Sequence, residues 1–350
     1  MTQLLKSGDD VFLMDRKKDG SAESGVDEKI YFEPGTSLHT LCAGDEVKLL
    51  RTAEELFSVE ISSRENLVAL SGGGSAVDRA KSFFEALVKL HRMRGRQLEA
   101  RDVELLCRMF RNGSGGELDS LWAGRVSVSP KKRDILPRSR RQLEYVRLMR
   151  EKDVVFGVGP AGTGKTYLAM AVAVSEFLAN RVSRIVLTRP ARESGERLGF
   201  LPGSLEEKVS PYLRPLYDAL YEMMTPDEAQ ELIDRRVIEI APLAFMRGRT
   251  LNNAFIILDE AQNTSVDQML MFLTRMGFGS KCVITGDPTQ SDLPRDERSG
   301  LEHAVETLKK LPEIGFVFMD TSDVVRHRLL EKIITSYTGK SFNNGKNTTP

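Results

Sequence analysis

A glycine-rich run that ends in a lysine and a threonine carries the clearest chemical signal of this sequence. The run fits the pattern G-x-x-x-x-G-K-[ST], and it stands between an apolar stretch typical of a strand, 154–157, and a helical stretch, 165–178. Its glycines let backbone N–H groups turn inward around a phosphate, and the N-terminus of the following helix adds partial positive charge. The pattern predicts a nucleotide-phosphate site, formed by Gly159, Pro160, Ala161, Gly162, Thr163, Gly164, Lys165 and Thr166.

The last two residues of this run have separate tasks in such a site. Lys165 is expected to reach the β- and γ-phosphates of ATP, and the hydroxyl of Thr166 is expected to bind Mg²⁺. An acidic pair, Asp259 and Glu260, follows another apolar stretch about ninety residues farther along the chain. We expect that stretch to be a strand next to the strand of the glycine run, so that Asp259 holds the magnesium shell and Glu260 activates the attacking water. Acidic pairs after strands are common, and this pair indicates a magnesium site only because a phosphate site is predicted in the same chain.

A third polar turn, Gly286–Gln290, follows the apolar stretch 282–285. A carboxamide there can donate a hydrogen bond to the γ-phosphate and orient water without adding charge. Glycine-aspartate turns are frequent, so the signal is weak by itself. Together with the acidic pair, it resembles motifs II and III of superfamily 1 helicases. The resemblance implies that Gln290 senses the γ-phosphate and that Gln142, upstream of the glycine run, contacts the adenine.

The regular alternation of apolar and helical stretches after Gln142 indicates the fold of this part. Near-continuously apolar strands are typical of a sheet that is covered on both faces. Alternating β and α segments favour a parallel, doubly wound sheet. We therefore predict an α/β fold, with a RecA-like P-loop core around a parallel sheet. Its strands are expected at 154–157, 184–188, 255–258, 282–285 and 316–319.

A smaller α+β unit is predicted ahead of that core, over residues 29–96. Its expected order of strand, helix, helix, strand, strand and helix resembles the KH fold. KH modules clamp nucleic acid with a GxxG loop between their two consecutive helices, whereas this sequence has Cys42–Asp45 at that place. Two interpretations stay open: the unit binds RNA without that loop, or it only packs or oligomerises.

The other segments complete the predicted division of the chain. Residues 1–28 and 340–350 have the polar composition of disordered tails. Residues 97–141 are predicted to form a helix and a basic linker, which is either solvated or in contact with phosphates. Residues 142–339 form the predicted ATPase core.

Composition limits the classes of function. Of the 350 residues, 41% are hydrophobic and 29% are charged, which is typical of a folded globular chain. Lysine plus arginine and aspartate plus glutamate both total 50, so any basic surface for nucleic acid has to be local. Three cysteines without a C-x-x-C pair favour neither a zinc site nor a disulfide framework. Without a signal peptide or an apolar run of the ~20 residues that a membrane span needs, a cytoplasmic protein without membrane contact is expected.

The stretch from Gln142 to Leu330 resembles the PhoH family of ATPases, in particular the longer branch that has a KH-like unit and lacks a PIN nuclease domain. The resemblance implies one helicase-like core and assembly into a homo-oligomeric ring, expected to be a hexamer. It also implies work on RNA alongside an endoribonuclease that matures rRNA. The motifs that carry the resemblance are Gly157–Ala169, Thr188–Arg192, Leu198–Gly203, Met246–Thr250, Leu258–Asn263 and Asp323–His327.

Five arginines are candidates for further roles. Arg326 follows the last predicted strand, and we expect it to neutralise charge on the γ-phosphate in the transition state, from its own chain or from a neighbour. Arg189 and Arg192 follow the second predicted strand, and Arg247 and Arg249 precede the strand of the acidic pair. Each of these four is either an ordinary surface arginine or a contact to RNA or to another subunit, and the resemblance favours contact.

Taken together, these patterns predict an Mg²⁺-dependent ATPase that acts in RNA metabolism. A motor that unwinds RNA is one hypothesis, although such helicases usually carry two RecA-like domains and only one fits here. The alternative is an ATP-driven switch or adaptor that recruits a nuclease or ribosomal partner without separating strands. A small-molecule kinase is disfavoured, because Glu260 supplies a water-activating base and no acceptor-binding segment stands out.

Overall fold

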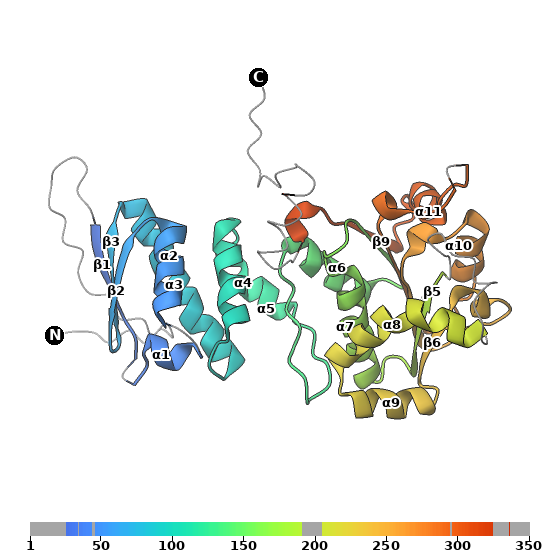
Figure 1. Ribbon diagram of the computed structural model, residues 1–350, viewed down its shortest axis with the longest axis horizontal. Coiled ribbons are helices and arrows are strands. Elements are labelled where there is room, and N and C mark those ends of the chain that lie inside the picture. The colour runs from blue at the N-terminus through green and yellow to red at the C-terminus, as the bar shows by residue number, and fades with distance from the viewer. Residues whose placement is uncertain are drawn as a thin grey trace, which may run out of the picture. The chain divides into compact units, whose positions relative to one another are not determined.

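The computed structural model of the chain describes residues 26–324, apart from 34, 44–45, 191–204 and 295, together with Ser336. Its internal contacts divide the chain between Ser120 and Leu121 into two compact units, which Figure 1 colours from blue to blue-green and from green to red. Within the described residues, no helix is long and apolar enough to cross a membrane.

The N-terminal unit has the predicted order of strand, helix, helix, strand, strand and helix. Its strands pair antiparallel in the order β1-β3-β2. The first strand starts at Val26, where the sequence predicted a tail through residue 28, because Val26 pairs with Gly72 at the far end of β3. The elements are β1 (Val26–Tyr31), α1 (Leu38–Leu41), α2 (Glu46–Phe57), β2 (Glu60–Arg64), β3 (Leu67–Gly72) and α3 (Gly74–Arg94).

The helix that the sequence placed in the linker packs into this same unit. It is α4 (Ala100–Arg111), and its Phe110 contacts Phe57 and Phe83, with ring centroids 5.8 and 5.4 Å apart. A 3₁₀ turn, η1 (Gly115–Glu117), and the short α5 (Leu118–Ala123) follow. The predicted boundary at residue 96 therefore cuts through one continuous apolar core.

Part of the predicted basic linker belongs to the core of the second unit. Val126 and Ile135 exchange two backbone hydrogen bonds of 2.8 and 2.9 Å. Val126 and Val128 are buried in the same apolar cluster as the central helices of that unit. The Ser129 hydroxyl donates to Glu228 at 2.9 Å, which ties the segment to a helix about a hundred residues away. The glycine and proline content suggested a free linker, whereas alternate valines anchor the segment.

The second unit is built on six parallel strands in the order β6-β5-β7-β8-β4-β9. This confirms the predicted RecA-like α/β core. Five of the strands were expected. The edge strand β6 was missed because Glu239 and Pro242 interrupt its apolar run, although three of its five residues are buried. The strands are β4 (Val154–Val158), β5 (Arg184–Arg189), β6 (Ile238–Pro242), β7 (Ala254–Leu258), β8 (Lys281–Gly286) and β9 (Ile314–Phe318).

Helices cover both faces of this sheet (Figure 1). One apolar cluster joins the sheet to α6, α7, α8 and α9, and the other joins it to α10 and α11. Neighbouring strand residues alternate between the clusters: Val155 belongs to the first and Phe156 to the second. The helices are α6 (Arg140–Glu151), α7 (Lys165–Leu178), α8 (Leu205–Met223), α9 (Pro226–Asp234), α10 (Val266–Leu273) and α11 (Gly300–Leu308), with 3₁₀ turns η3 (Leu243–Met246), η4 (Ala261–Asn263), η5 (Pro288–Gln290) and η6 (Thr321–Asp323).

We expect a fragment that starts at Leu121 to fold by itself and a fragment that starts at Lys131 to be clearly less stable. The shorter fragment lacks Val126 and Val128, and burial of a valine side chain contributes about 1.5–3 kcal/mol. Thermal unfolding followed by circular dichroism measures the difference. Equal melting temperatures for the two fragments would show that residues 121–130 add nothing to this core.

Candidate active site

The glycine-rich loop connects β4 to α7 at the carboxyl edge of the parallel sheet. At Gly159 the backbone has φ +151°, and a Cβ atom would lie 2.3 Å from the carbonyl oxygen of Met319. Only glycine fits there, because the chain after β9 passes directly against the loop. The Gly159 N–H donates to the carbonyl of Gly286 at 3.1 Å, so the loop is tied to the end of β8 as well.

Lys165 is the first residue of α7, and its side chain folds back over the glycine-rich loop. Its Nζ donates to the carbonyl oxygens of Gly159 and Pro160, at 2.6 and 2.8 Å. Burial lowers the pKa of Lys165, and the carboxylates of Asp287, Asp259 and Glu260 oppose that shift. A desolvated ammonium favours an anionic ligand, because the charged form then regains the stabilisation that water supplied. Lys165 is thus suited to a phosphate.

The carboxylate of Asp259 connects the ends of β7 and β8 with the start of α7. Its Oδ1 accepts hydrogen bonds from the hydroxyls of Thr166 at 2.6 Å and Thr285 at 2.7 Å. The expected neighbourhood of strands was wrong in one respect, since β8 lies between β7 and β4. Asp259 reaches Thr166 across the end of β8, where the hydroxyl of Thr285 donates to the same oxygen.

Gln142 in α6 donates a hydrogen bond to the backbone of the phosphate loop. The residue is 3% exposed, its Oε1 accepts from the Arg138 N–H at 2.6 Å, and its Nε2 donates to the carbonyl of Thr163 at 3.0 Å. One end of the amide therefore holds the phosphate loop, and the other end holds the backbone just ahead of α6. The contact to adenine that the helicase resemblance implied stays a prediction.

Asp287 is a site residue to which the sequence analysis assigned no role. It is 4% exposed, its Oδ2 accepts from the Ala161 N–H of the loop at 3.1 Å, and its Oδ1 accepts from the Thr289 hydroxyl at 2.7 Å. Its own N–H donates to Oε1 of Gln262 at 3.0 Å. Asp287 thus connects the loop to the segment after β7. Its position directly after a strand was the available signal.

Glu260 adopts a left-handed backbone conformation, with φ +53° and ψ +40°, that is uncommon for residues other than glycine. Arg189 at the end of β5 donates to Oε1 at 2.7 Å, and the amide of Gln262 donates to Oε2. Arg189 was expected to contact RNA or another subunit, and here it contacts the predicted general base. Such strained positions cluster at functional sites.

The other predicted residues are exposed, contact other groups or lie outside the described residues. Gln290 ends η5 with an exposed side chain, and its carbonyl accepts from Gln262 at 3.3 Å. Arg249 forms an ion pair with Glu239, at 2.5 Å, whereas the side chain of Arg247 is exposed. The residues Arg192 and Arg326 fall outside the described part of the chain.

The chemistry of these groups fits a magnesium nucleotide. A hydroxyl and a carboxylate 2.6 Å apart are hard oxygen ligands, and Mg²⁺ is commonly bound through one or two such groups plus substrate phosphates. The loop amides and a buried ammonium supply positive charge for the phosphates. A further carboxylate, on Glu260, follows Asp259 directly in the chain, and the sequence predicted it as the proton acceptor.

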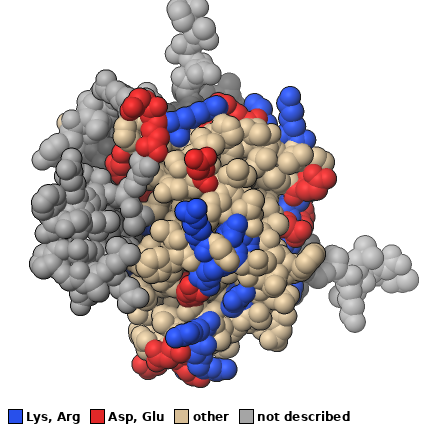
Figure 2. All heavy atoms as spheres, turned by 90° about the vertical axis from the view of Figure 1, so that its right-hand side faces the viewer, with Lys and Arg blue, Asp and Glu red and all other residues tan. Residues whose placement is uncertain are grey.

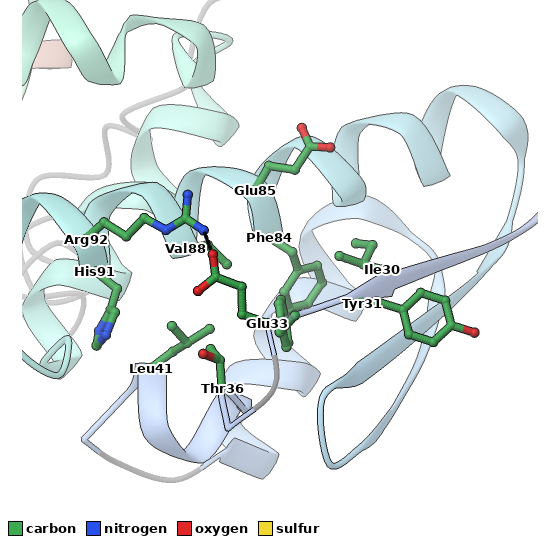
Figure 3. Close-up of a pocket in the computed structure, with 11 residues that line it drawn as sticks. Ile30, Tyr31, Glu33, Thr36, Leu41, Phe84, Glu85, Val88, His91 and Arg92 are labelled. Carbon is green, nitrogen blue, oxygen red and sulfur yellow. Dashed lines mark hydrogen bonds and ion pairs between the residues drawn. The ribbon is translucent and has the colours of Figure 1, made fainter. Parts of the chain in front are cut away.

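The N-terminal unit contains a cavity of a different kind (Figure 3). Its volume is about 180 Å³, and Leu41 and Phe84 form part of an apolar floor. Arg92 and Glu33 form an ion pair of 2.5 Å at its border, and Figure 3 shows Tyr31 pointing away from it. The cavity lacks the loop amides and the buried ammonium that make the phosphate site.

Comparison with known proteins places this site among related sequences. Residues 134–338 match the model of a protein family described as PhoH-like protein. A PhoH-like protein of Mycobacterium tuberculosis (strain ATCC 25618 / H37Rv) is 46% identical over 322 residues, which cover 92% of this chain and 89% of that protein.

Two further relatives show how far the similarity extends. A PhoH-like protein of Bacillus subtilis (strain 168) is 46% identical over 294 residues, which cover 84% of this chain and 92% of that protein. Protein PhoH of Escherichia coli (strain K12) is 42% identical over 206 residues, or 58% of each chain.

Replacement of Thr285 by valine tests the geometry around Asp259. The change keeps the shape of the side chain but removes one of the two hydroxyls that donate to Oδ1. Loss of such an outer hydrogen bond to a metal ligand typically lowers metal affinity or activity about 10- to 100-fold. We expect a larger Mg²⁺ requirement for ATP hydrolysis, measured by titrating Mg²⁺ at fixed ATP. Thr285→Ser retains the hydroxyl and serves as the control, and equal Mg²⁺ curves for both variants would contradict the assignment.

Proposed function

The chain belongs to the family of PhoH-like proteins, and on that basis we propose that it binds ATP with Mg²⁺ and hydrolyses it at the site around Lys165. The observation that carries the proposal is the contact of 2.6 Å between Thr166 and Asp259. These two residues come from the loop that suits phosphates and from a strand two positions away in the sheet. Their contact places a pair of candidate Mg²⁺ ligands next to the loop that would bind the phosphates.

In the proposed reaction each residue has one task. Lys165 and the backbone N–H groups of Gly162, Thr163 and Gly164 bind the phosphates, and Thr166 and Asp259 hold Mg²⁺, which neutralises phosphate charge when bound. Glu260 accepts a proton from the attacking water at its carboxylate. Gln290 would contact the γ-phosphate, which requires its exposed side chain to turn toward the loop. Arg326 is proposed to stabilise developing charge from the same or a neighbouring subunit.

Work on RNA is the second part of the proposal. Its support is the family and a local basic surface: Figure 2 shows Lys and Arg side chains near the middle of a largely uncharged face of the second unit. The neutral total charge of the chain made such a local cluster the expected form of an RNA contact. Arg247 and Arg249 remain proposed contacts to RNA or to another subunit. We further propose that the chain assembles into a ring of identical subunits and is located in the cytoplasm. Its proposed partner is an endoribonuclease that matures rRNA.

Glu260→Gln tests the assignment of the general base. The variant should still bind ATP, because the phosphate loop and Asp259 are intact, but its turnover should fall by about a hundredfold or more. Lys165→Ala is the comparison, and it should lose ATP affinity as well as turnover. Both quantities are measured on the same preparations. A Glu260→Gln protein with normal turnover would place the base elsewhere.

RNA stimulation separates the two forms of the proposed function. An RNA motor should hydrolyse ATP several times faster with single-stranded RNA and should separate a duplex with a single-stranded overhang. A switch or adaptor should respond to RNA or to its protein partner without separating strands. Turnover and strand separation are measured in one assay, with Glu260→Gln protein as the inactive control. Duplex separation by that control would show that the observed unwinding does not depend on ATP hydrolysis.

A further inference from the structure

The predicted general base is held by two donors at once. Arg189 Nη2 lies 2.7 Å from Glu260 Oε1, and Gln262 Nε2 donates to Oε2. The pair follows from the sheet: β5 and β7 are neighbours, and the Asp259 N–H donates to the Thr188 carbonyl at 2.9 Å. The residues that follow Thr188 and Asp259 are therefore side by side.

This arrangement opposes the task that Glu260 has in hydrolysis. A general base has to offer an oxygen to a water molecule and then hold its proton. Here the Arg189 guanidinium engages one oxygen of the carboxylate, and the Gln262 amide engages the other. The backbone at Glu260 is left-handed, with φ +53°, and these two contacts hold its side chain in place. The contacts thus describe a base at rest.

Arg189 is also accessible from outside. Its side chain is 20% exposed and that of Glu260 is 34% exposed, so a second anion can approach the guanidinium. A guanidinium binds phosphate oxygens in the same manner as carboxylate oxygens. A phosphate group and Glu260 would therefore compete for Arg189.

We propose that Arg189 is a positioning residue that holds Glu260 at rest, and that a phosphate of bound RNA takes over the guanidinium and frees Glu260 for hydrolysis. The inference rests on the proposed ATPase and RNA-binding activities, and it assigns the coupling between them to one ion pair. Arg189 itself takes no part in the chemical step.

The first test is ATP turnover at saturating Mg²⁺ and ATP without RNA. Arg189→Ala should raise this basal rate about twofold to tenfold, the range that one partly exposed ion pair can hold back. Addition of an oligouridine RNA should then raise it no further. Arg189→Lys retains the charge and should behave like the parent protein. Arg184→Ala is the matched control, since it removes an arginine from the other end of β5 that donates to the Asn252 carbonyl at 3.4 Å.

The second test needs no hydrolysis. Affinity of the nucleotide-free protein for a fluorescent oligouridine is measured for the parent, Glu260→Gln, Arg189→Ala and the double variant. Glu260→Gln should bind RNA more tightly, because the charge of the carboxylate that competes with RNA phosphate for Arg189 is then removed. Arg189→Ala should bind more weakly, and Glu260→Gln should have no further effect in its background.

A lower basal rate in Arg189→Ala would overturn the proposal, since the guanidinium would then assist hydrolysis. An unchanged basal rate, or equal RNA affinity of the parent and Glu260→Gln, would overturn it as well. Failure of the proposed function has a different signature: the parent protein would hydrolyse no ATP with or without RNA.

Discussion

The carboxylate of Asp259 is the group on which the rest of the site depends. It is 6% exposed, and a buried carboxylate is costly unless its oxygens accept hydrogen bonds. Thr166 from the phosphate loop and Thr285 from β8 supply them, both to Oδ1. These bonds fix the first turn of α7 against the ends of two strands. Because the strands are parallel, their carboxyl ends meet at one edge, so a single acceptor can hold three segments that are far apart in the sequence.

Positively and negatively charged side chains surround this carboxylate. Lys165 is desolvated and faces Asp259, Glu260 and Asp287, so its charge is partly balanced before any nucleotide is present. Asp287 engages an amide of the loop, and Arg189 engages Glu260. A nucleotide would bring more negative charge into this set. In the proposed reaction, its binding would therefore redistribute these contacts.

The phosphate loop and the acidic pair were predictable from the sequence because both follow apolar runs that can only be buried strands. The order of strands was not predictable, and β8 between β7 and β4 is set by packing over the whole sheet. The roles of Asp287 and Thr285 were not predicted for a related reason, because their partners lie 126 and 26 positions away in the sequence. At the start of the second unit, Val126 and Val128 look like linker residues until the groups that bury them are known. Gln142 was predicted to contact adenine, which stays a prediction, and its contacts in the structure are to Thr163 of the loop and to Arg138.

The most direct test of the account is whether Mg²⁺ and ATP strengthen each other's binding through Asp259. Isothermal titration of ATP, with and without Mg²⁺, gives the coupling free energy between the two ligands. The comparison is made between the parent protein and Asp259→Asn, which keeps the size of the side chain and removes its charge. The account predicts that the parent binds ATP more tightly with Mg²⁺ and that Asp259→Asn loses most of this gain while it still binds ATP without metal. An equal gain in both proteins would contradict the assignment of Asp259 as the magnesium residue.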